Sequence, residues 1–269
     1  MDGASRLMSR RQNEIIALLR ETGRVGVEDL ARQFEVSPQT IRRDLNEMSE
    51  GRLITRVHGG AIVASGVENL AYEARKLVAQ SHKRLIGEAA ARLIPDNSSL
   101  FINLGTTTEE VAHALAGRSG LLVITNNLNV ATELYRSRGI EVIITGGNVR
   151  ASDGGIVGAT TVDLIRQFRV DTAVIGISAI DPDGTLLDFD IREVHVSRAI
   201  IENARRVILV TDSSKFARSA PARIGTLADI DILVTDHLPT PAIADLCRSH
   251  DVAVVETGGP QESDTGSID

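Results

Sequence analysis

The fold is decided at residues 37–48, which read Ser-Pro-Gln-Thr-Ile-Arg-Arg-Asp-Leu-Asn-Glu-Met. Ser37 is suited to cap a helix, because its hydroxyl accepts a hydrogen bond from a free backbone N–H, and Pro38 fits the first helical position. Apolar side chains then recur at helical spacing, at Ile41, Leu45 and Met48. The stretch predicts a short helix with one face against a core.

The opposite face of this helix carries side chains that suit DNA. Arg can pair with guanine, Gln and Asn with adenine, and Thr with either base or with phosphate. The candidate DNA-binding residues of the helix are Ser37, Gln39, Thr40, Arg42, Arg43 and Asn46. Taken alone, the face is also compatible with an ordinary solvated helix surface.

The flanking segments favour the DNA-binding interpretation. Residues 27–34 form a second amphipathic pattern, joined by the short link 35–37, and a first helix is expected at 9–22. Two short helices with so tight a link are typical of a helix-turn-helix. Residues 52–63 hold two β-rich runs around Gly59-Gly60, which predicts a hairpin.

A hairpin after a recognition helix is a wing, from which Arg52, Arg56 and His58 would reach the DNA backbone. The N-terminal segment is therefore predicted to be a winged helix-turn-helix that binds double-stranded operator DNA.

Composition limits the class of protein. The 269 residues are 42% hydrophobic and 24% charged, as in ordinary globular proteins, and suggest about two domains. The single cysteine, Cys247, fits a reducing compartment. No apolar run approaches the ~20 residues that span a bilayer, and residues 1–11 lack the apolar segment of a signal peptide. We expect a cytoplasmic protein with no membrane contact.

Net charge is unevenly divided. Residues 1–62 hold ten of the 29 basic and nine of the 36 acidic residues, a net of +1, which leaves 19 basic and 27 acidic residues, a net of −8, for the rest. An acidic body is repelled by DNA, so contact should be confined to the N-terminal segment. Two basic clusters, Arg75-Lys76 and Lys83-Arg84, lie in a helical stretch at 72–93 and are interpreted as a solvated helix face rather than a DNA contact.

From Pro95 onward, short apolar runs alternate with helical patterns. Continuous β-branched runs separated by helices predict a parallel sheet that is covered on both faces. The predicted strands are 99–104, 121–125, 141–145, 172–177, 207–211, 231–235 and 252–255. The expected organisation is a DNA-binding domain at 1–63, a linker and connecting helix at 64–94, an α/β domain at 95–257 and a disordered tail at 258–269.

Small and polar residues follow several of these strands. Because ligands bind at the carboxyl ends of the strands in an open α/β sheet, these positions are candidates for an anionic ligand, with a helix N-terminus and Lys215 supplying positive charge. The candidate residues are Gly105, Thr106, Thr107, Thr108, Asn126, Asn127, Gly146, Gly147 and Lys215. Ordinary turn chemistry is the alternative for each of them singly.

Catalytic and metal-binding patterns are weak. His113, His195, His237 and His250 have no metal-ligand spacing, and Cys247 lies in a helical context, so no metal or cofactor is expected. Acidic residues near the ligand edge are confined to Asp188, Asp190 and Glu193. They are interpreted either as binding sugar hydroxyls or a neighbouring subunit, or as a solvated loop.

These residues together resemble the DeoR family of bacterial transcriptional regulators over nearly the whole chain. The resemblance rests on Val36 to Leu45, on Val57-His58-Gly59-Gly60-Ala61, and on the strand-end motifs Gly105-Thr106-Thr107, Thr125-Asn126-Asn127, Gly146-Gly147 and Asp212-Ser213-Ser214-Lys215-Phe216. Within the family, residues 123–131, 153–158, 183–190 and 198–203 are most similar to regulators of glycerol-3-phosphate metabolism.

The resemblance implies a homo-oligomeric repressor, a dimer or tetramer, that leaves its operator when a phosphorylated metabolite binds the C-terminal domain. That domain is similar in fold to ribose-5-phosphate isomerase. This chain departs from the enzyme at two acids, where it has Ile175 and Ser178, and at the catalytic lysine, near Asp188. The resemblance thus implies a sensor without catalysis. The alternatives are a sensor of another sugar phosphate and an isomerase with a DNA-binding appendage.

Overall fold

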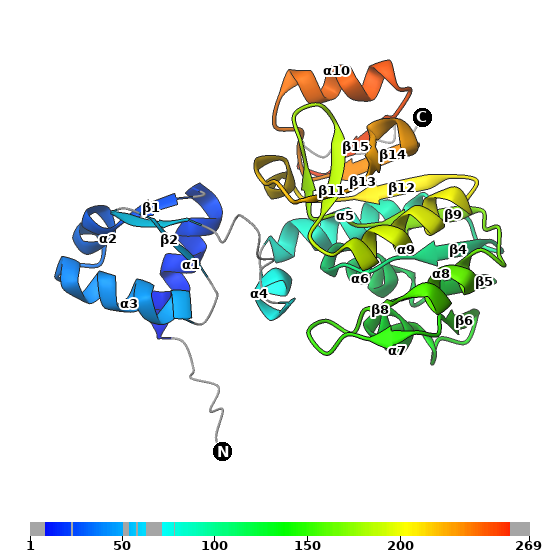
Figure 1. Ribbon diagram of the computed structural model, residues 1–269, viewed down its shortest axis with the longest axis horizontal. Coiled ribbons are helices and arrows are strands. Elements are labelled where there is room, and N and C mark those ends of the chain that lie inside the picture. The colour runs from blue at the N-terminus through cyan, green and yellow to red at the C-terminus, as the bar shows by residue number, and fades with distance from the viewer. Residues whose placement is uncertain are drawn as a thin grey trace, which may run out of the picture. The chain divides into compact units, whose positions relative to one another are not determined.

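The computed structural model describes residues 9–22, 24–50, 54–57, 59–62, 72–77 and 79–258. The chain divides into two compact units, residues 1–79 and 80–269 (Figure 1). Within the predicted linker and connecting helix at 64–94, residues 64–71 lie outside the described residues, and so does the predicted tail after Gly258.

The first unit contains a three-helix core and a small sheet (Figure 1). Its helices are α1 (Arg10–Thr22), α2 (Val27–Gln33), α3 (Pro38–Glu50) and α4 (Tyr72–Leu77). Its strands are β1 (Arg24–Gly26), β2 (Thr55–Val57) and β3 (Gly60–Ile62), antiparallel in the order β1-β3-β2. The three predicted helices and the hairpin are confirmed. Strand β1 was missed, because three residues are too short to show an alternating pattern.

Helix α3 begins as its sequence predicts. The Ser37 hydroxyl accepts a hydrogen bond from the Thr40 backbone N–H at 3.1 Å. The apolar stripe of the helix is fully buried, in a cluster with α1 and α2 that includes Ile41, Leu45, Met48, Ile15, Leu19 and Leu30. Burial of this stripe leaves the polar face of α3 outward.

Gly60 fixes the wing to the rest of the first unit. It pairs with Gly26, and a Cβ at position 60 would lie 2.0 Å from the carbonyl oxygen of Val25. No side chain fits at that separation, so only glycine allows β3 to lie against β1.

The second unit is built on a seven-stranded sheet, β15-β14-β12-β9-β4-β5-β6, in which every pair is parallel. The strands are β4 (Ser99–Ile102), β5 (Leu121–Thr125), β6 (Ile140–Ile144), β9 (Thr172–Ile175), β12 (Val207–Val210), β14 (Ile232–Thr235) and β15 (Ala253–Glu256). The predicted parallel sheet is confirmed.

Helices cover both faces of this sheet (Figure 1). One core cluster joins α5 (Gln80–Arg92), α6 (Thr106–Leu115) and α7 (Leu128–Leu134) to one face, through residues such as Ile86 and Val111. The other joins α8 (Ala159–Ile165), α9 (Ile191–Glu202) and α10 (Pro241–Ser249) to the second face. Alternate residues of β4 divide between them: Leu100 and Ile102 belong to the first cluster and Phe101 to the second.

Smaller elements complete the second unit. A three-stranded antiparallel sheet has the order β10 (Ala179–Ile180), β11 (Thr185–Asp188), β13 (Ala222–Thr226), and a hairpin pairs β7 (Asn148–Val149) with β8 (Ile156–Val157). Two 3₁₀ helices, η1 (Ser213–Ala217) and η2 (Leu227–Asp229), follow β12 and β13. The sequence analysis missed the short strands because most have only two to four residues.

The expected continuous helix at 72–93 is wrong. It is two helices, α4 and α5, separated by Ala79, whose φ of 52° lies in the left-handed region. Such a backbone angle ends a helix, because it breaks the hydrogen-bonding pattern. The expected solvated face is also wrong for Lys83, which is only 3% exposed, whereas Arg84 points to solvent and pairs with Glu88.

Candidate DNA interface and candidate effector site

The polar face of α3 is available for a ligand. Gln39, Arg42, Arg43 and Asn46 are exposed, and Thr40 is half-buried. Arg43 donates to Glu47 at 3.2 Å, one turn along the helix, and Arg42 reaches Glu28 of α2 at 3.5 Å. Pairs of this kind at the surface are weak, about 0–1 kcal/mol, so both guanidinium groups can exchange a carboxylate for a DNA phosphate.

Two contacts hold α3 on α1 and set the angle of that face. Arg11 donates to the buried carboxylate of Asp44 at 2.6 Å, and this pairing raises the pKa of Arg11. Gln12 donates to Glu47 at 3.1 Å. Of the predicted wing residues, Arg52, His58 and the side chain of Arg56 lie outside the described residues.

In the second unit, the sheet reverses its winding between β4 and β9. In the order of the sheet, β4, β5 and β6 follow one another toward one edge, and β9, β12, β14 and β15 follow one another toward the opposite edge. A crevice for ligands forms at the carboxyl ends of strands at such a switch point. Gly105 after β4 and Gly176 after β9 meet there: a Cβ on Gly176 would lie 3.9 Å from the Cα of Gly105.

Gly105 shapes the loop before α6. Its φ of 148° lies in a region that favours glycine, and it precedes the first residue of the helix. Thr106 and Thr107 then present the free backbone N–H groups of the first turn, which attract an anion. The Thr108 hydroxyl is already used, since it donates to the carbonyl oxygens of Asn103 and Gly105 at 2.7 and 2.8 Å.

The two asparagines after β5 differ in their roles. The side-chain oxygen of Asn127 caps α7 by accepting from Asn129, and its amide donates to Glu109 at 3.1 Å, so its side chain is occupied. Asn126 is 1% exposed and donates to the carbonyl of Ile156 at 3.2 Å. Its Oδ1 is buried with no hydrogen-bond partner among the described residues. A buried acceptor in that state favours a ligand with a hydroxyl or N–H group.

Gly146 and Gly147 pack against α8. Thr161 donates to the carbonyl of Gly146 at 2.7 Å, and a Cβ on Gly147 would lie 2.3 Å from the Thr161 hydroxyl. The structure thus gives both glycines a packing role.

Asp190 and Glu193 surround an arginine that the sequence analysis did not single out. Arg150 forms a bidentate pair with Asp153, at 2.8 and 2.6 Å, and its remaining Nη1 contacts Asp190 at 3.0 Å and Glu193. Asp190 also caps α9 by accepting from the Arg192 backbone N–H. Buried Asp188 accepts from the Ser178 hydroxyl at 3.0 Å. These acids therefore do not form the solvated loop considered from sequence.

Two of the carboxylates around half-buried Arg150 have divergent proton affinities. Hydrogen bonding to Arg192 lowers the pKa of Asp190 to about 2. Burial, reinforced by the negative charge of Asp188, raises the pKa of Glu193 to about 7. The Arg150 ion pair does not reverse that rise, because Arg150 shares its charge with Asp153 and Asp190. This side of the site can lose or gain a proton near neutral pH.

Lys215 lies on η1, at the other side of the switch point. Burial alone raises the pKa of neighbouring Asp212, but the charges of Lys215 and Lys83 and hydrogen bonds from Ser214 outweigh it, and the net pKa lies below its usual value. Asp212 Oδ1 accepts the Ser214 N–H at 3.1 Å, whereas the buried Oδ2 has no hydrogen-bond partner among the described residues.

The structure thus joins the predicted residues after β4 and β5 to those around Arg150, through Asn129, which donates to both Glu109 and the Asp153 carbonyl. The charge of Lys215 acts on Asp212, and η1, which carries Lys215, packs beside β10.

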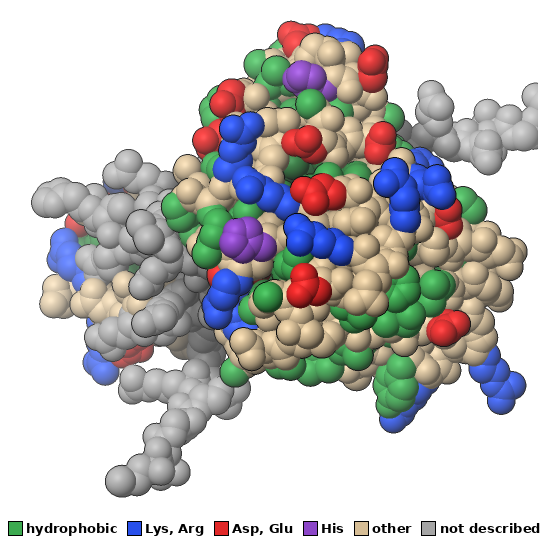
Figure 2. All heavy atoms as spheres, turned by 45° about the vertical axis from the view of Figure 1, so that its right-hand side comes forward, with side chains coloured by type: hydrophobic (Ala, Val, Ile, Leu, Met, Phe, Trp, Pro, Cys, Tyr) green, Lys and Arg blue, Asp and Glu red, His purple; other side chains and the backbone are tan. Residues whose placement is uncertain are grey.

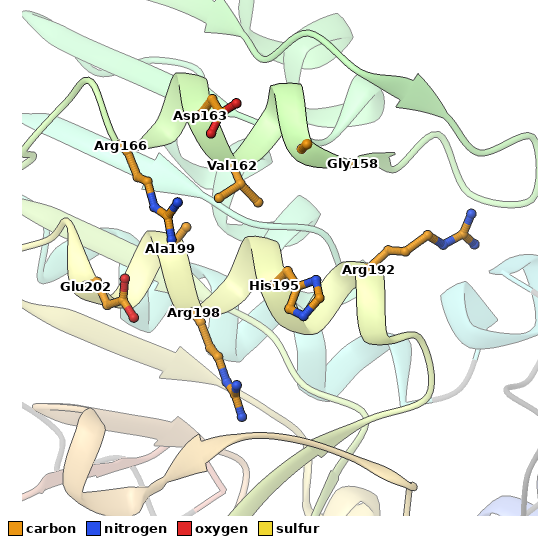
Figure 3. A pocket seen from close by; sticks show the side chains of 10 residues that line it. Gly158, Val162, Asp163, Arg166, Arg192, His195, Arg198, Ala199 and Glu202 are labelled. Carbon is orange, nitrogen blue, oxygen red and sulfur yellow. The ribbon is translucent and has the colours of Figure 1, made fainter.

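A separate pocket of about 600 Å³ lies between α8 and α9, lined by residues that include Val162, Arg166, His195, Arg198 and Glu202. In Figure 3, Arg166 extends from α8 toward Ala199, whereas Arg198 points away from α8; Arg198 donates to the carbonyls of Ile224 and Arg223. None of the predicted effector residues lines this pocket. Figure 2 shows basic and acidic side chains interspersed over one face of the molecule, with no extended surface of one sign in that view.

Within the described ranges, no group of three or more His, Cys, Asp or Glu side chains is placed to hold a metal ion. Nor does any described helix combine the length and apolarity needed to cross a membrane.

The first unit is a winged helix-turn-helix, and the second is an α/β unit with polar groups suited to a ligand at the carboxyl ends of its strands. This combination defines the class of ligand-responsive DNA-binding regulators. Family comparison agrees: residues 11–67 match the DeoR-like helix-turn-helix domain and residues 78–237 the DeoR C-terminal sensor domain. The chain belongs to the DeoR family of transcriptional regulators.

Two relatives extend over most of the chain. A glycerol-3-phosphate regulon repressor of Escherichia coli K12 is 46% identical over 91% of this chain and 97% of its own length. The repressor of the same name from Haemophilus influenzae is 48% identical over 86% of this chain and 90% of its own length. The expected likeness to ribose-5-phosphate isomerase is found in the Neisseria gonorrhoeae enzyme, with 15% identity, coverage of 51% and 53% of the two chains and a TM-score of 0.38. That likeness concerns the fold alone.

Proposed function

We propose that this protein represses genes of glycerol-3-phosphate metabolism and leaves its operator when glycerol-3-phosphate binds the second unit. The observation that carries the proposal is the 46% identity to a glycerol-3-phosphate regulon repressor, which runs through both units. The exposed polar face of α3 and the strand-end polar groups at the switch point supply the chemistry that such a role needs.

At the DNA end, Gln39, Thr40 and Asn46 read bases, and Arg42 and Arg43 bind phosphates or guanine. Ser37 contributes by capping α3 and so orients the first turn of the reading face. Arg56 and His58 of the wing contact the backbone of the DNA. Helix-turn-helix proteins read paired half-sites, so the functional form is a homo-oligomer, a dimer or tetramer. As a regulator of chromosomal genes, it acts in the cytoplasm.

At the effector end, electropositive groups bind the phosphate of the proposed ligand, and hydrogen-bond acceptors bind its hydroxyls. The phosphate binds the backbone N–H groups of Thr106 and Thr107 and the ammonium group of Lys215, because both attract a dianion. The hydroxyls bind the unpartnered oxygen of Asn126 and the carboxylates around Arg150, because carboxylates accept hydrogen bonds from hydroxyls and repel a phosphate.

Four other predicted residues support this site without direct contact. Thr108 and Asn127 use their side chains to shape the loops after β4 and β5. Gly146 and Gly147 let the loop after β6 lie against α8, which places the hairpin that carries Arg150.

We also propose that the second unit senses without catalysis. Where the isomerase has acids, this chain has Ile175, which is fully buried in the core, and Ser178, whose hydroxyl is bonded to Asp188. A turnover assay on aldose and ketose phosphates tests this: measurable isomerisation by the purified protein would refute it.

The proposed function is tested with an operator selected by the full-length chain from random duplexes. Specific binding is titrated against glycerol-3-phosphate, glycerol, fructose phosphates and inorganic phosphate at fixed salt, because affinity for DNA depends on ionic strength. Glycerol-3-phosphate is expected to release the operator at the lowest concentration. Release by a hexose phosphate at lower concentration would assign a different effector, and no release by any ester would refute the sensor role.

A further inference from the structure

Helix α5 packs on β12 and β14, and the chain after β12 carries Lys215, the proposed phosphate ligand. Its Lys83 is buried and its charge acts on Asp212, which follows β12. His82 Nδ1 lies 3.0 Å from Oδ2 of Asp236, which follows β14. Two successive residues in the first turn of α5 thus act on two buried carboxylates: His82 contacts Asp236, and the charge of Lys83 acts on Asp212.

Those carboxylates are fixed in the loops. Asp236 accepts the backbone N–H of Ser213 at 2.7 Å and its hydroxyl at 2.9 Å. Asp212 is 1% exposed, and Ser214 binds only its Oδ1. Its Oδ2 is buried with no hydrogen-bond partner among the described residues. This oxygen can accept a further hydrogen bond without the loss of one already made.

The position of α5 in the chain gives this contact its importance. The helix begins at Gln80, where the second unit begins, directly after Ala79 with its φ of 52°. A non-glycine residue in that conformation marks a turn whose geometry the surrounding structure imposes. The first turn of α5 is thus the part of the second unit that directly follows, in sequence, the segment leading from the DNA-binding unit.

We propose that His82 and Lys83 couple effector binding to DNA release, by drawing the first turn of α5 toward Asp236 and Asp212 when the effector is bound. The inference rests on the proposed function. Without effector, Lys215 and Lys83 both balance the charge of Asp212. A phosphate that engages Lys215 leaves Lys83 as the main counter-charge, so the attraction between Asp212 and α5 increases.

The test separates effector binding from its consequence. Lys83→Met removes the charge and keeps a similar length of side chain. The adjacent Arg84→Met is the matched control, because Arg84 is exposed and its ion pair among the described residues lies within α5, with Glu88. For each full-length variant, calorimetry measures glycerol-3-phosphate binding, and fluorescence anisotropy measures operator affinity with and without saturating effector.

In the parent and in Arg84→Met, effector should weaken operator binding by about tenfold or more, an ordinary size for allosteric coupling. In Lys83→Met, the weakening should fall below about twofold, while effector affinity and effector-free operator affinity stay near parent values. Full release by Lys83→Met would overturn the proposal. A drop in effector affinity that accounts for the whole drop in effector-induced operator release would also overturn the proposal, since Lys83 would then act in effector binding alone.

If Lys83→Met does not fold, His82→Gln carries the test, because His82 is half exposed and its removal disturbs little of the core. It should reduce the effector-induced weakening severalfold without change in effector affinity; an unchanged ratio would overturn the proposal. A parent protein that neither binds nor responds to a phosphate ester would instead refute the proposed function itself.

Discussion

The recognition helix and the strand-end site present polar side chains in opposite ways. On α3, the polar groups are exposed, and Arg43 and Arg42 have their partners within one helix turn or on the neighbouring helix α2. At the strand ends, Asn126 and Asp212 are buried, and half-buried Arg150 contacts Asp190 across 40 positions of sequence. The difference teaches that a surface which meets a large partner needs only one well-placed helix, whereas a site that encloses a small ligand must be assembled from several segments.

The comparison predicts the largest loss at Arg150. In Arg150→Met, three carboxylates lose their shared cation, and removal of one partner from a buried ion pair costs about 3–5 kcal/mol. Urea unfolding of the variant should show this loss. Exposed Arg192→Met, which removes another cation from Asp190, should shift the unfolding curve far less, because an exposed ion pair is weakened by solvent. Equal losses in the two variants would show that burial does not distinguish them.

A second prediction concerns pH and sharpens the comparison at Glu193. Its folded pKa is raised to about 7, so the folded state holds a proton that the unfolded state releases near its ordinary value of 4.5. The contribution to stability is full below that ordinary value and declines as pH rises through the raised one. The difference in unfolding free energy between pH 5 and pH 7.5 should therefore shrink in Glu193→Gln, a result that equal pH profiles would contradict.

The exposed face should respond in DNA affinity rather than in folding. Arg43→Ala should weaken binding to operator and random duplex alike, with a salt slope lower by about 1, because one phosphate contact is lost. Thr40→Val should instead reduce the ratio of the affinity for operator to the affinity for random duplex. Anisotropy titrations at several salt concentrations check both, and identical effects of the two variants would remove the assigned roles.

The smallest expected effect tests the start of α3. Ser37→Ala removes the hydroxyl that accepts the Thr40 N–H and should destabilise the first unit by about 1 kcal/mol. Ser37→Asp, which retains an acceptor, should restore most of the loss in thermal unfolding. A loss that persists in Ser37→Asp would mean that the cap is not its cause.

The same contrast explains what sequence alone could predict. The cap, stripe and polar face of α3 lie within 12 residues, so periodicity and residue type were sufficient for the helix-turn-helix. The parallel sheet was also predictable, because its strands are continuous apolar runs. Arg150 and Lys83 were not, since their importance comes from partners far along the chain, Asp190 and Asp212. Nothing in the local pattern around Lys83 distinguishes it from solvent-facing Arg84.

The close fit of Gly60 against Val25 bears on how the protein releases DNA. The wing is joined to the first unit twice, by pairing of β3 with β1 and by the Val27 N–H, which donates to the Gly59 carbonyl at 2.8 Å. The wing and the recognition helix α3 should therefore move as one rigid body. The effector would not need to unfold a DNA-binding unit in order to release DNA. A change in the spacing of the intact DNA-binding units of the oligomer along the duplex would be enough to lower operator affinity.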